Sequence, residues 1–221
     1  MDTIENPHAR PDLRHPGVGL VLASRWRVGT PERQRATVRA IRRAWRSRDW
    51  PDAGLLSYSV FVGSDGDTLL HHSQWTSEER YRDFVRTQRD GRNAEIDAAV
   101  PGIERVGLRR LAPPFRTTVY EAEGREAAVP GCVAVSLVEI GPEGPDALAD
   151  ALEAAGAEGG GDGRIAAYAH LTTDGTHLFH YAEWESETAH VRRQAETGAF
   201  AGIADDRTRR YAPALSLSAG A

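Results

Sequence analysis

Residues 65–78 read DGDTLLHHSQWTSE, and residues 174–187 read DGTHLFHYAEWESE. Seven positions are identical between the two stretches without a gap, including the tryptophan, a residue that occurs only five times in the chain. Self-similarity at a fixed spacing is the mark of a duplicated unit. We therefore interpret the chain as two diverged copies of one small fold.

The first copy predicts the order strand, helix, strand, strand, helix, strand. Thr30-Pro31-Glu32 supplies a helix N-cap, a proline at the first helical position and an early acid, and the helix should run to about Arg46. Asp65-Gly66 lies between two strand-like runs and predicts a hairpin. Thr76 with Glu79 offers a capping box for the second helix. The expected strands cover residues 18–26, 55–62, 68–75 and 105–111.

The second copy follows the same order. Its expected elements are a strand at 132–140, a helix after Pro145-Asp146, a hairpin of residues 165–172 and 177–184, a helix from Ser186 and a strand at 211–217. This is the ferredoxin-like order of an α+β fold. Helices on one face of such a sheet leave the other face to be covered. We therefore expect two tandem ferredoxin-like (βαββαβ) repeats that form an intrachain dimeric α+β barrel.

The domain boundaries follow from the repeat and from composition. We expect an N-terminal arm over residues 1–16, a first domain over 17–120, a polar linker over 121–130 and a second domain over 131–221. The arm contains three prolines and is expected to be disordered or ordered by contact. The sequence leaves open whether two such chains pair into a homodimer.

Composition excludes several classes of protein. With 27 Lys and Arg against 32 Asp and Glu, the chain lacks the strongly basic balance of a nucleic-acid binder. No apolar run approaches the roughly 20 residues that span a bilayer, and the N-terminus does not read as a signal peptide, so we expect a cytoplasmic protein and no membrane partner. The single cysteine, Cys132, lies in an apolar run and is expected to be buried. The histidines of the sequence are not joined by an Asp or Glu into a compact triad, so the sequence does not favour a metal site.

The candidate site rests on strand alternation. Side chains alternate along a strand, so His71 and Trp75 share one face, as do His180 and Trp184 in the second copy. We expect each pair to face a common hollow, where the indole supplies an aromatic wall and the imidazole accepts a proton. Packing of a core tryptophan beside a satisfied histidine is the competing interpretation. Tyr81, on the following helix, is a further candidate for the chemistry. Four aromatic residues are candidates for the walls that bind the substrate: Trp26, Trp45, Tyr58 and Phe84.

At these residues the sequence resembles the antibiotic biosynthesis monooxygenase family. The resemblance rests on Ser64-Asp65-Gly66, the run from His71 to Glu78, Tyr81, Arg92-Asn93-Ala94-Glu95-Ile96 and Pro101-Gly102. It covers nearly all of the first copy and, more faintly, the second. It implies small ferredoxin-like units paired into barrels that oxidise aromatic polyketides such as anthrones with dioxygen and without flavin, metal or haem.

Three positions depart from the family pattern. The family's strand asparagine is His71 here and His180 in the repeat, its upstream tyrosine is Val60, and its helix arginine is Asp97. The resemblance assigns the asparagine and the arginine to holding an oxygen anion, so the usual mechanism needs a variant.

That variant makes His71 a base that deprotonates a phenol or an activated methylene. The resulting carbanion passes an electron to dioxygen while Trp75 stacks on the polycycle and Tyr81 binds its carbonyl. Such a base needs a pKa near the working pH, which an unperturbed histidine has, at about 6.5. Three alternatives stay open: a cyclase or isomerase of the same barrel class, a haem-degrading relative, and a non-catalytic binding or assembly protein.

Overall fold

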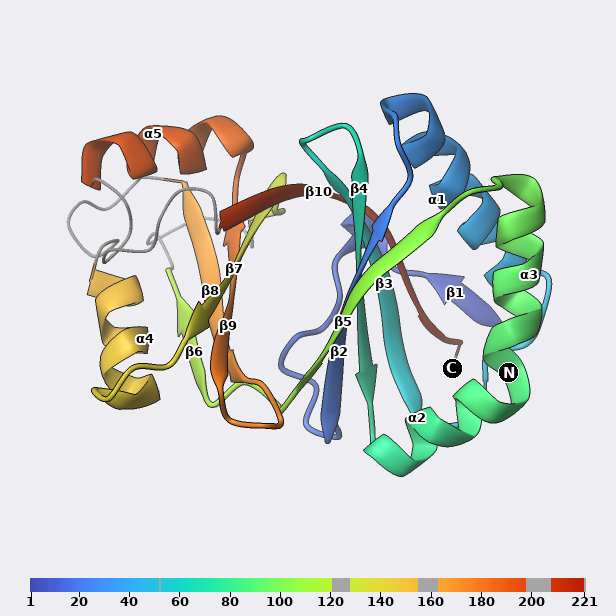
Figure 1. The fold of residues 1–221 in the computed structure, drawn as a ribbon, viewed down its shortest axis with the longest axis horizontal. Coiled ribbons are helices and arrows are strands. Elements are labelled where there is room, and N and C mark those ends of the chain that lie inside the picture. Colours follow the sequence, from blue (N-terminus) through green and yellow to red (C-terminus); the bar gives the residue numbers. More distant parts are fainter. Residues whose placement is uncertain (52, 121–127, 155–162, 198–207, 221) are drawn as a thin grey trace. The chain divides into compact units, whose positions relative to one another are not determined.

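The structure is a computed structural model that describes residues 1–51, 53–120, 128–154, 163–197 and 208–220. The chain divides into two compact units (Figure 1). Unit 1 comprises Met1–Arg110 and Pro213–Ala221, and unit 2 comprises Leu111–Ala212. Each unit therefore contains a segment that the sequence assigns to the other repeat: residues 213–221 in unit 1 and residues 111–120 in unit 2.

Unit 1 is built on an antiparallel sheet with its helices on one face (Figure 1). Its core elements are β2 (Leu20–Arg27), α1 (Pro31–Arg46), β3 (Leu55–Gly63), β4 (Thr68–Trp75), α2 (Glu78–Phe84), the π-helical segment η2 (Val85–Arg89), α3 (Asp90–Ala99) and β5 (Glu104–Leu111). The strands follow the order β5-β2-β4-β3. This is the ferredoxin-like arrangement that the sequence predicts.

Unit 2 repeats the arrangement. Its elements are β6 (Arg116–Val119), β7 (Cys132–Glu139), α4 (Gly144–Ala154), β8 (Arg164–Leu171), β9 (His177–Trp184), α5 (Glu187–Thr197) and the first part of β10 (Thr208–Ala219). The strand order is β10-β7-β9-β8-β6. The prediction of two tandem ferredoxin-like repeats is thus confirmed.

The backbone confirms that the two tryptophans are equivalent. Trp75 on β4 pairs with Leu20 and Leu55, and Trp184 on β9 pairs with Cys132 and Arg164. Both indoles are 2% exposed. Both hairpins turn at a glycine of positive φ after an aspartate, at +73° for Gly66 and +72° for Gly175. Equivalent strands in equivalent registers place the His71 and His180 side chains on equivalent faces.

A close backbone approach recurs in both units. A Cβ on Gly19 would lie 2.2 Å from the Thr76 carbonyl oxygen, and a Cβ on Gly131 would lie 2.4 Å from the Glu185 carbonyl oxygen. Glycine is required where backbones approach so closely.

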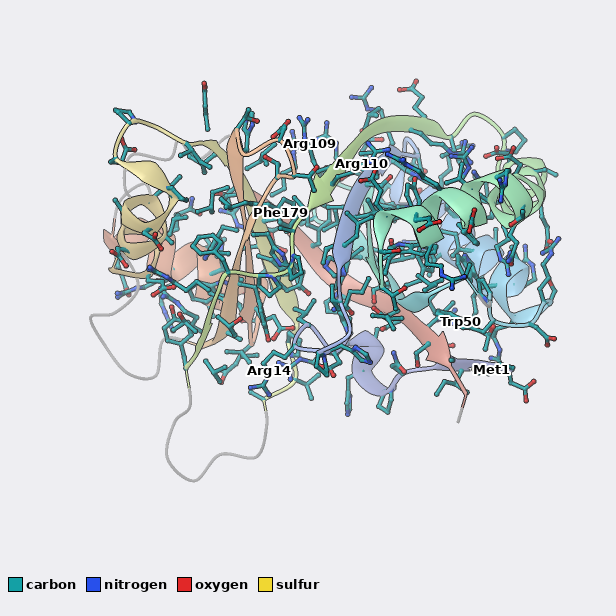
Figure 2. The ribbon with its side chains drawn as sticks, turned by 90° about the horizontal axis from the view of Figure 1, so that it is seen from below. Met1, Arg14, Trp50, Arg109, Arg110 and Phe179 are labelled. Carbon is teal, nitrogen blue, oxygen red and sulfur yellow. The ribbon has the colours of Figure 1, made fainter. Side chains whose placement is uncertain are left out.

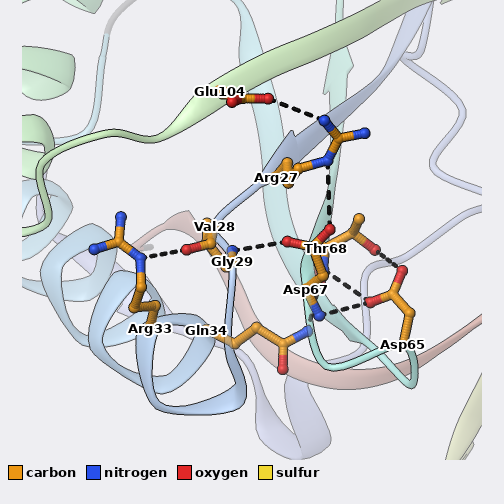
Figure 3. Close-up of polar contacts among 9 residues, drawn as sticks. All are labelled: Arg27, Val28, Gly29, Arg33, Gln34, Asp65, Asp67, Thr68 and Glu104. Carbon is orange, nitrogen blue, oxygen red and sulfur yellow. Dashed lines mark hydrogen bonds and ion pairs between the residues drawn. The ribbon is translucent and has the colours of Figure 1, made fainter.

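Local polar contacts fix the first hairpin against α1 (Figure 3). The Asp65 carboxylate accepts hydrogen bonds from the backbone N–H groups of Asp67 and Thr68 and from the Thr68 hydroxyl. The buried Gln34 amide donates to the Gly63 and Thr68 carbonyls at 2.9 Å. The Asp-Gly turn is therefore held by side chains as well as by its own backbone.

The predicted cap of α1 is confirmed, whereas that of α2 is wrong by one residue. The Thr30 hydroxyl accepts from the Arg33 N–H, as expected. On α2 the cap is Ser77, which accepts from the Arg80 N–H. Thr76 still belongs to the end of the sheet, because its N–H donates to the Gly54 carbonyl.

The strands at the sheet edges were not expected. β1 (Thr3–Glu5) pairs with β10, so part of the N-terminal arm is ordered by contact. β10 also lies beside β3 and so extends the sheet of unit 1, whereas β6 pairs with β8 and extends the sheet of unit 2. The unit 2 sheet thus ends in β6, which follows the last strand of the first repeat, whereas in unit 1 the strand β10 pairs with β1 as well. Most of the expected linker, residues 121–127, lies outside the described residues.

The core of unit 1 is rich in aromatic residues. Trp45 and Trp50 are buried with ring centroids 5.6 Å apart. The Trp50 backbone N–H donates to the Met1 carbonyl, which ties the N-terminus to the end of α1; both residues are labelled in Figure 2. In unit 2 Cys132 is 1% exposed, as predicted, and burial raises the pKa of its thiol to about 11.

No helix among the described residues is long and apolar enough to cross a membrane. The pairing of the two repeats into a barrel stays a prediction, as does the division into arm, domains and linker.

Candidate active site

A cavity of about 500 Å³ lies in unit 1 between the sheet and the helices. Its lining residues come from both layers: Leu22, Ser24, Trp26, Trp45, Tyr58, His71, Ser73, Trp75, Tyr81, Phe84, Arg89, Arg92, Asn93, Ile96, Asp97, Arg105, Gly107 and Leu108. This volume lies within the range of small-molecule sites, and the wall is mostly apolar with a few polar groups.

All seven candidates from the first copy line this cavity. Strand alternation brings His71 and Trp75 to the helix-facing side of β4, and Tyr81 and Phe84 meet them from α2. His180 and Trp184 line a different hollow in unit 2. The expectation of one common hollow is therefore wrong, because each pair faces the helices of its own unit.

His71 is held by Tyr58. The Tyr58 hydroxyl oxygen lies 2.7 Å from Nδ1 of His71, and the Trp26 ring lies 4.0 Å from the imidazole, centroid to centroid. Among the described residues, Nε2 of His71 has no hydrogen-bond partner although it is buried. Imidazole nitrogen is a better acceptor than phenol oxygen, so Tyr58 donates to Nδ1 and the His71 proton sits on Nε2.

The environment keeps His71 neutral. Burial, with a smaller contribution from the Arg105 charge, lowers the pKa of His71 to about 3. Burial also raises the pKa of Tyr58 well above its ordinary value. The expectation that His71 keeps a pKa near 6.5 is therefore wrong, because its imidazole is enclosed by aromatic rings and a cation. A neutral imidazole with its proton on Nε2 acts as a hydrogen-bond donor rather than as a base.

Aromatic rings form the remaining wall. The Trp75 indole N–H donates to the Ser73 hydroxyl at 2.9 Å, which orients the ring. The ring meets Tyr81 edge-on at 5.3 Å and lies 5.2 Å from Phe84, centroid to centroid. Trp45 stacks on Tyr58 with centroids 4.4 Å apart. Such rings suit a flat aromatic ligand.

Sequence reasoning missed the arginines of this cavity. The Arg105 guanidinium lies 4.5 Å from the centroid of the Trp26 ring and pairs with Asp97 at 3.0 Å. Arg92 lies over Trp45 and Arg89 pairs with Asp90. Arg89 ends the π-helical segment, a feature that is frequent at functional sites. Asp97, which stands where the family has its arginine, thus holds another arginine at the cavity.

The corresponding hollow in unit 2 is about 20 Å³, enough for roughly one water molecule. Arg164 lies in its wall, with its guanidinium 5.1 Å from the centroid of the Trp184 ring and bonded to the Tyr120 hydroxyl at 2.9 Å. His190 stands at the position of Tyr81 and contacts Trp184 edge-on. Burial lowers the pKa of His180 and of His190 to about 4.

Register explains the difference between the hollows. Arg164 occupies the position of Leu55, because each pairs with the tryptophan of its own unit. Ala167 likewise takes the place of Tyr58. His180 therefore lacks the phenol that orients His71. Among the described residues of the chain, no group of three or more His, Cys, Asp or Glu side chains is arranged to hold a metal ion.

Comparison with known proteins identifies the fold. No protein-family model and no curated protein matches the sequence. Among solved structures, an anthrone oxidase-like protein is similar over 99% of this chain and 97% of its own, with a TM-score of 0.64 and 18% identity. A candidate monooxygenase from Fusobacterium nucleatum has a TM-score of 0.53 at 9% identity, over 93% of this chain and 96% of its own. A candidate monooxygenase from Lactobacillus acidophilus has a TM-score of 0.54 at 8% identity, over 91% of this chain and 96% of its own.

These likenesses extend over both repeats, so the tandem arrangement is shared as a whole. At such identities they establish the fold alone. The resemblance to antibiotic biosynthesis monooxygenases is thereby confirmed at the level of the fold.

Proposed function

We propose that the chain is an oxygenase that oxidises a flat, anthrone-like aromatic molecule with dioxygen in the unit 1 cavity, without flavin, metal or haem. The observation that carries the proposal is the cavity of about 500 Å³, whose wall combines aromatic rings with the imidazole of His71, a residue whose Nε2 has no hydrogen-bond partner among the described residues. The fold shared with an anthrone oxidase-like protein supports the reaction class. A role in antibiotic or other secondary metabolism belongs to the same proposal.

The reaction converts a ring methylene into a carbonyl. The substrate loses one proton to solvent and binds as its enolate, which gives one electron to dioxygen. The carbon radical and superoxide combine to form a C–O bond, and protonation gives a hydroperoxide. Loss of water then leaves the quinone carbonyl, so one oxygen atom enters the product and the other leaves as water.

His71 holds the enolate oxygen in this proposal. His71 lines the cavity, its Nε2 has no hydrogen-bond partner among the described residues, and Tyr58 holds the other ring nitrogen, Nδ1. A donor that is positioned before the charge develops stabilises an oxyanion without reorganising. His71 thus takes over the part that the resemblance assigns to the missing asparagine.

The neighbouring residues orient the substrate. Trp75, fixed by Ser73, offers its ring face to the polycycle, and Tyr81 reaches the same space from α2 to bind a carbonyl. Arg105 also lines the cavity, where its guanidinium pairs with Asp97 at 3.0 Å.

Oxygen uptake with a simple anthrone tests the function. We expect protein-dependent consumption of dioxygen and formation of the corresponding anthraquinone in buffer treated with a chelator, and no quinone under nitrogen. The background oxidation of the anthrone is subtracted with heat-denatured protein.

Other outcomes contradict the proposal in recognisable ways. Conversion of a polyketide precursor under nitrogen would identify a cyclase or isomerase. A Soret shift on haem titration would indicate a haem-degrading relative. Binding of aromatic compounds without turnover of any of them would indicate a binding or assembly protein.

A further inference from the structure

Arg92 is a buried cation in the wall of the unit 1 cavity. Arg92 lies on α3 and is only 4% exposed. Its guanidinium lies 4.8 Å from the centroid of the Trp45 ring and 5.6 Å from that of the Phe84 ring. Burial of a guanidinium costs free energy unless hydrogen bonds and a counter-charge compensate for the lost hydration.

The partners of Arg92 are neutral. Its Nη1 donates to the carbonyl and to the side-chain oxygen of Gln88, and its Nη2 donates to the Asp49 carbonyl, all at 3.3 Å. Within the described part of the chain, its Nε has no acceptor, and Arg92 forms no ion pair. Hydrogen bonds to an ionised partner are shorter, at about 2.7–2.9 Å, and about twice as strong.

The other charged groups of the cavity have partners already. Arg105 pairs with Asp97 and Arg89 pairs with Asp90, each at 3.0 Å. Glu95, whose charge acts on Arg92, pairs with Arg48 at 2.7 Å. Three arginines and Asp97 line the cavity, and Arg92 is the one of these arginines to which the described residues supply no ion-pair partner.

We infer that the molecule bound in this cavity is an aromatic carboxylate, whose ionised group pairs with Arg92. The inference rests on the proposed function and narrows its substrate to an acidic polycycle. The rings lie along the Trp75 and Tyr81 wall, and the carboxylate supplies the counter-charge that the described residues do not give the Arg92 guanidinium. A planar guanidinium favours a planar carboxylate over other anions because two parallel hydrogen bonds can form.

A matched pair of probes tests this without turnover. Anthraquinone-2-carboxylate and anthraquinone-2-carboxamide have nearly the same shape and differ in charge. Their affinities are measured under nitrogen by quenching of the fluorescence of the cavity tryptophans. We expect the wild-type protein to bind the carboxylate at least about tenfold more tightly than the carboxamide.

Variants assign the preference to one side chain. Arg92→Gln should reduce the preference to less than about threefold, and Arg92→Lys should keep part of it. Arg39→Gln, at an exposed position of the same charge on α1, is the control and should leave the preference unchanged. Circular dichroism confirms that each variant is folded.

Several results would overturn the inference. These are equal affinity of the wild-type protein for the two probes, an undiminished preference in folded Arg92→Gln, and no binding of either probe. The wild-type comparison decides the matter even if the variants fail to fold. Oxygen uptake with an anthrone decides the proposed function separately, so that either idea can fail while the other stands.

Discussion

Units 1 and 2 have the same succession of elements and the same strand registers, yet they enclose different spaces. Unit 1 surrounds about 500 Å³ with aromatic rings, whereas the matching hollow in unit 2 measures about 20 Å³ and has Arg164 in its wall. The imidazole and the indole recur in both. The difference shows that the recurring His and Trp are compatible with a closed core as well as with an open site, and that the residues around them decide which is formed.

The largest expected effect separates the two histidines. His71→Ala should lower the rate of anthrone oxidation about 100-fold or more, because it removes a preorganised donor to the enolate oxygen. His180→Ala should leave the rate within about twofold. Initial rates of oxygen uptake provide the measurement.

His71→Asn sharpens this test. Asparagine keeps an N–H donor but no basic nitrogen, so partial recovery relative to His71→Ala supports the donor role. A rate as low as that of the alanine variant would argue for a base instead. Equal losses from His71→Ala and His180→Ala would contradict the assignment of the site to unit 1.

Tyr58 should matter next. Tyr58→Phe removes the hydrogen bond to Nδ1 and frees the imidazole to exchange its tautomers. We expect kcat to fall about tenfold, less than in His71→Ala, while the ring still fills the wall. Introducing a phenol in unit 2 by Ala167→Tyr is the reverse change, and it should not create activity in a His71→Ala background. A rate unchanged in Tyr58→Phe would show that His71 needs no orientation.

Lowering the pH should destabilise the two units to different extents. Burial lowers the pKa of His170, His180 and His190 in unit 2 to about 4, and that of His71 in unit 1 to about 3. A folded-state pKa below the unfolded value means that the unfolded state binds more protons, so stability is present above about pH 6.5 and is lost as the pH falls toward 4. Each histidine contributes on the order of 1–2 kcal/mol of loss at pH 5.

Unit 2, with three such histidines, should therefore open first. Hydrogen exchange followed by mass spectrometry at pH 7 and pH 5 can resolve the two units, after correction for the intrinsic pH dependence of exchange. His170→Phe should flatten the response in unit 2. Greater acid sensitivity in unit 1 would contradict the assignment of buried neutral imidazoles.

The smallest effect concerns the indoles. The Trp75 N–H donates to Ser73, whereas the Trp184 N–H has no hydrogen-bond partner among the described residues, since Ala182 stands where Ser73 does. Ser73→Ala should thus cost about 1 kcal/mol in unfolding free energy, by urea denaturation. Ala182→Ser should be neutral or slightly stabilising. Equal destabilisation by both changes would indicate that the hydroxyl acts through packing alone.

Local signals account for most of what the sequence could predict. β4 and β9 have the predicted bounds because Asp-Gly turns and tryptophans mark both ends of each strand. The face shared by His71 and Trp75 followed from alternation alone. The cap at Ser77 was missed because Thr76, an equally good cap by residue type, is engaged by Gly54.

Long-range pairing was beyond the sequence. No local pattern shows that residues 116–119 join β8 or that β10 lies beside β3, because edge pairing depends on where the whole chain runs. Arg92 is part of the sequence motif on which the resemblance rests, but the motif alone does not indicate a role for its side chain. Its burial over Trp45 becomes visible only once α3 is placed after the π-helical segment.

The shared strand β10 has a consequence for how the protein is made. Residues 213–219 lie beside β3 and include Ser216, whose hydroxyl accepts from that of Ser59 at 2.9 Å. During translation these residues emerge after all of unit 2 up to Ala212, so β3 stays uncovered on this side until then. A nonsense mutation shortly before residue 213 would therefore damage the part of the molecule that was translated first.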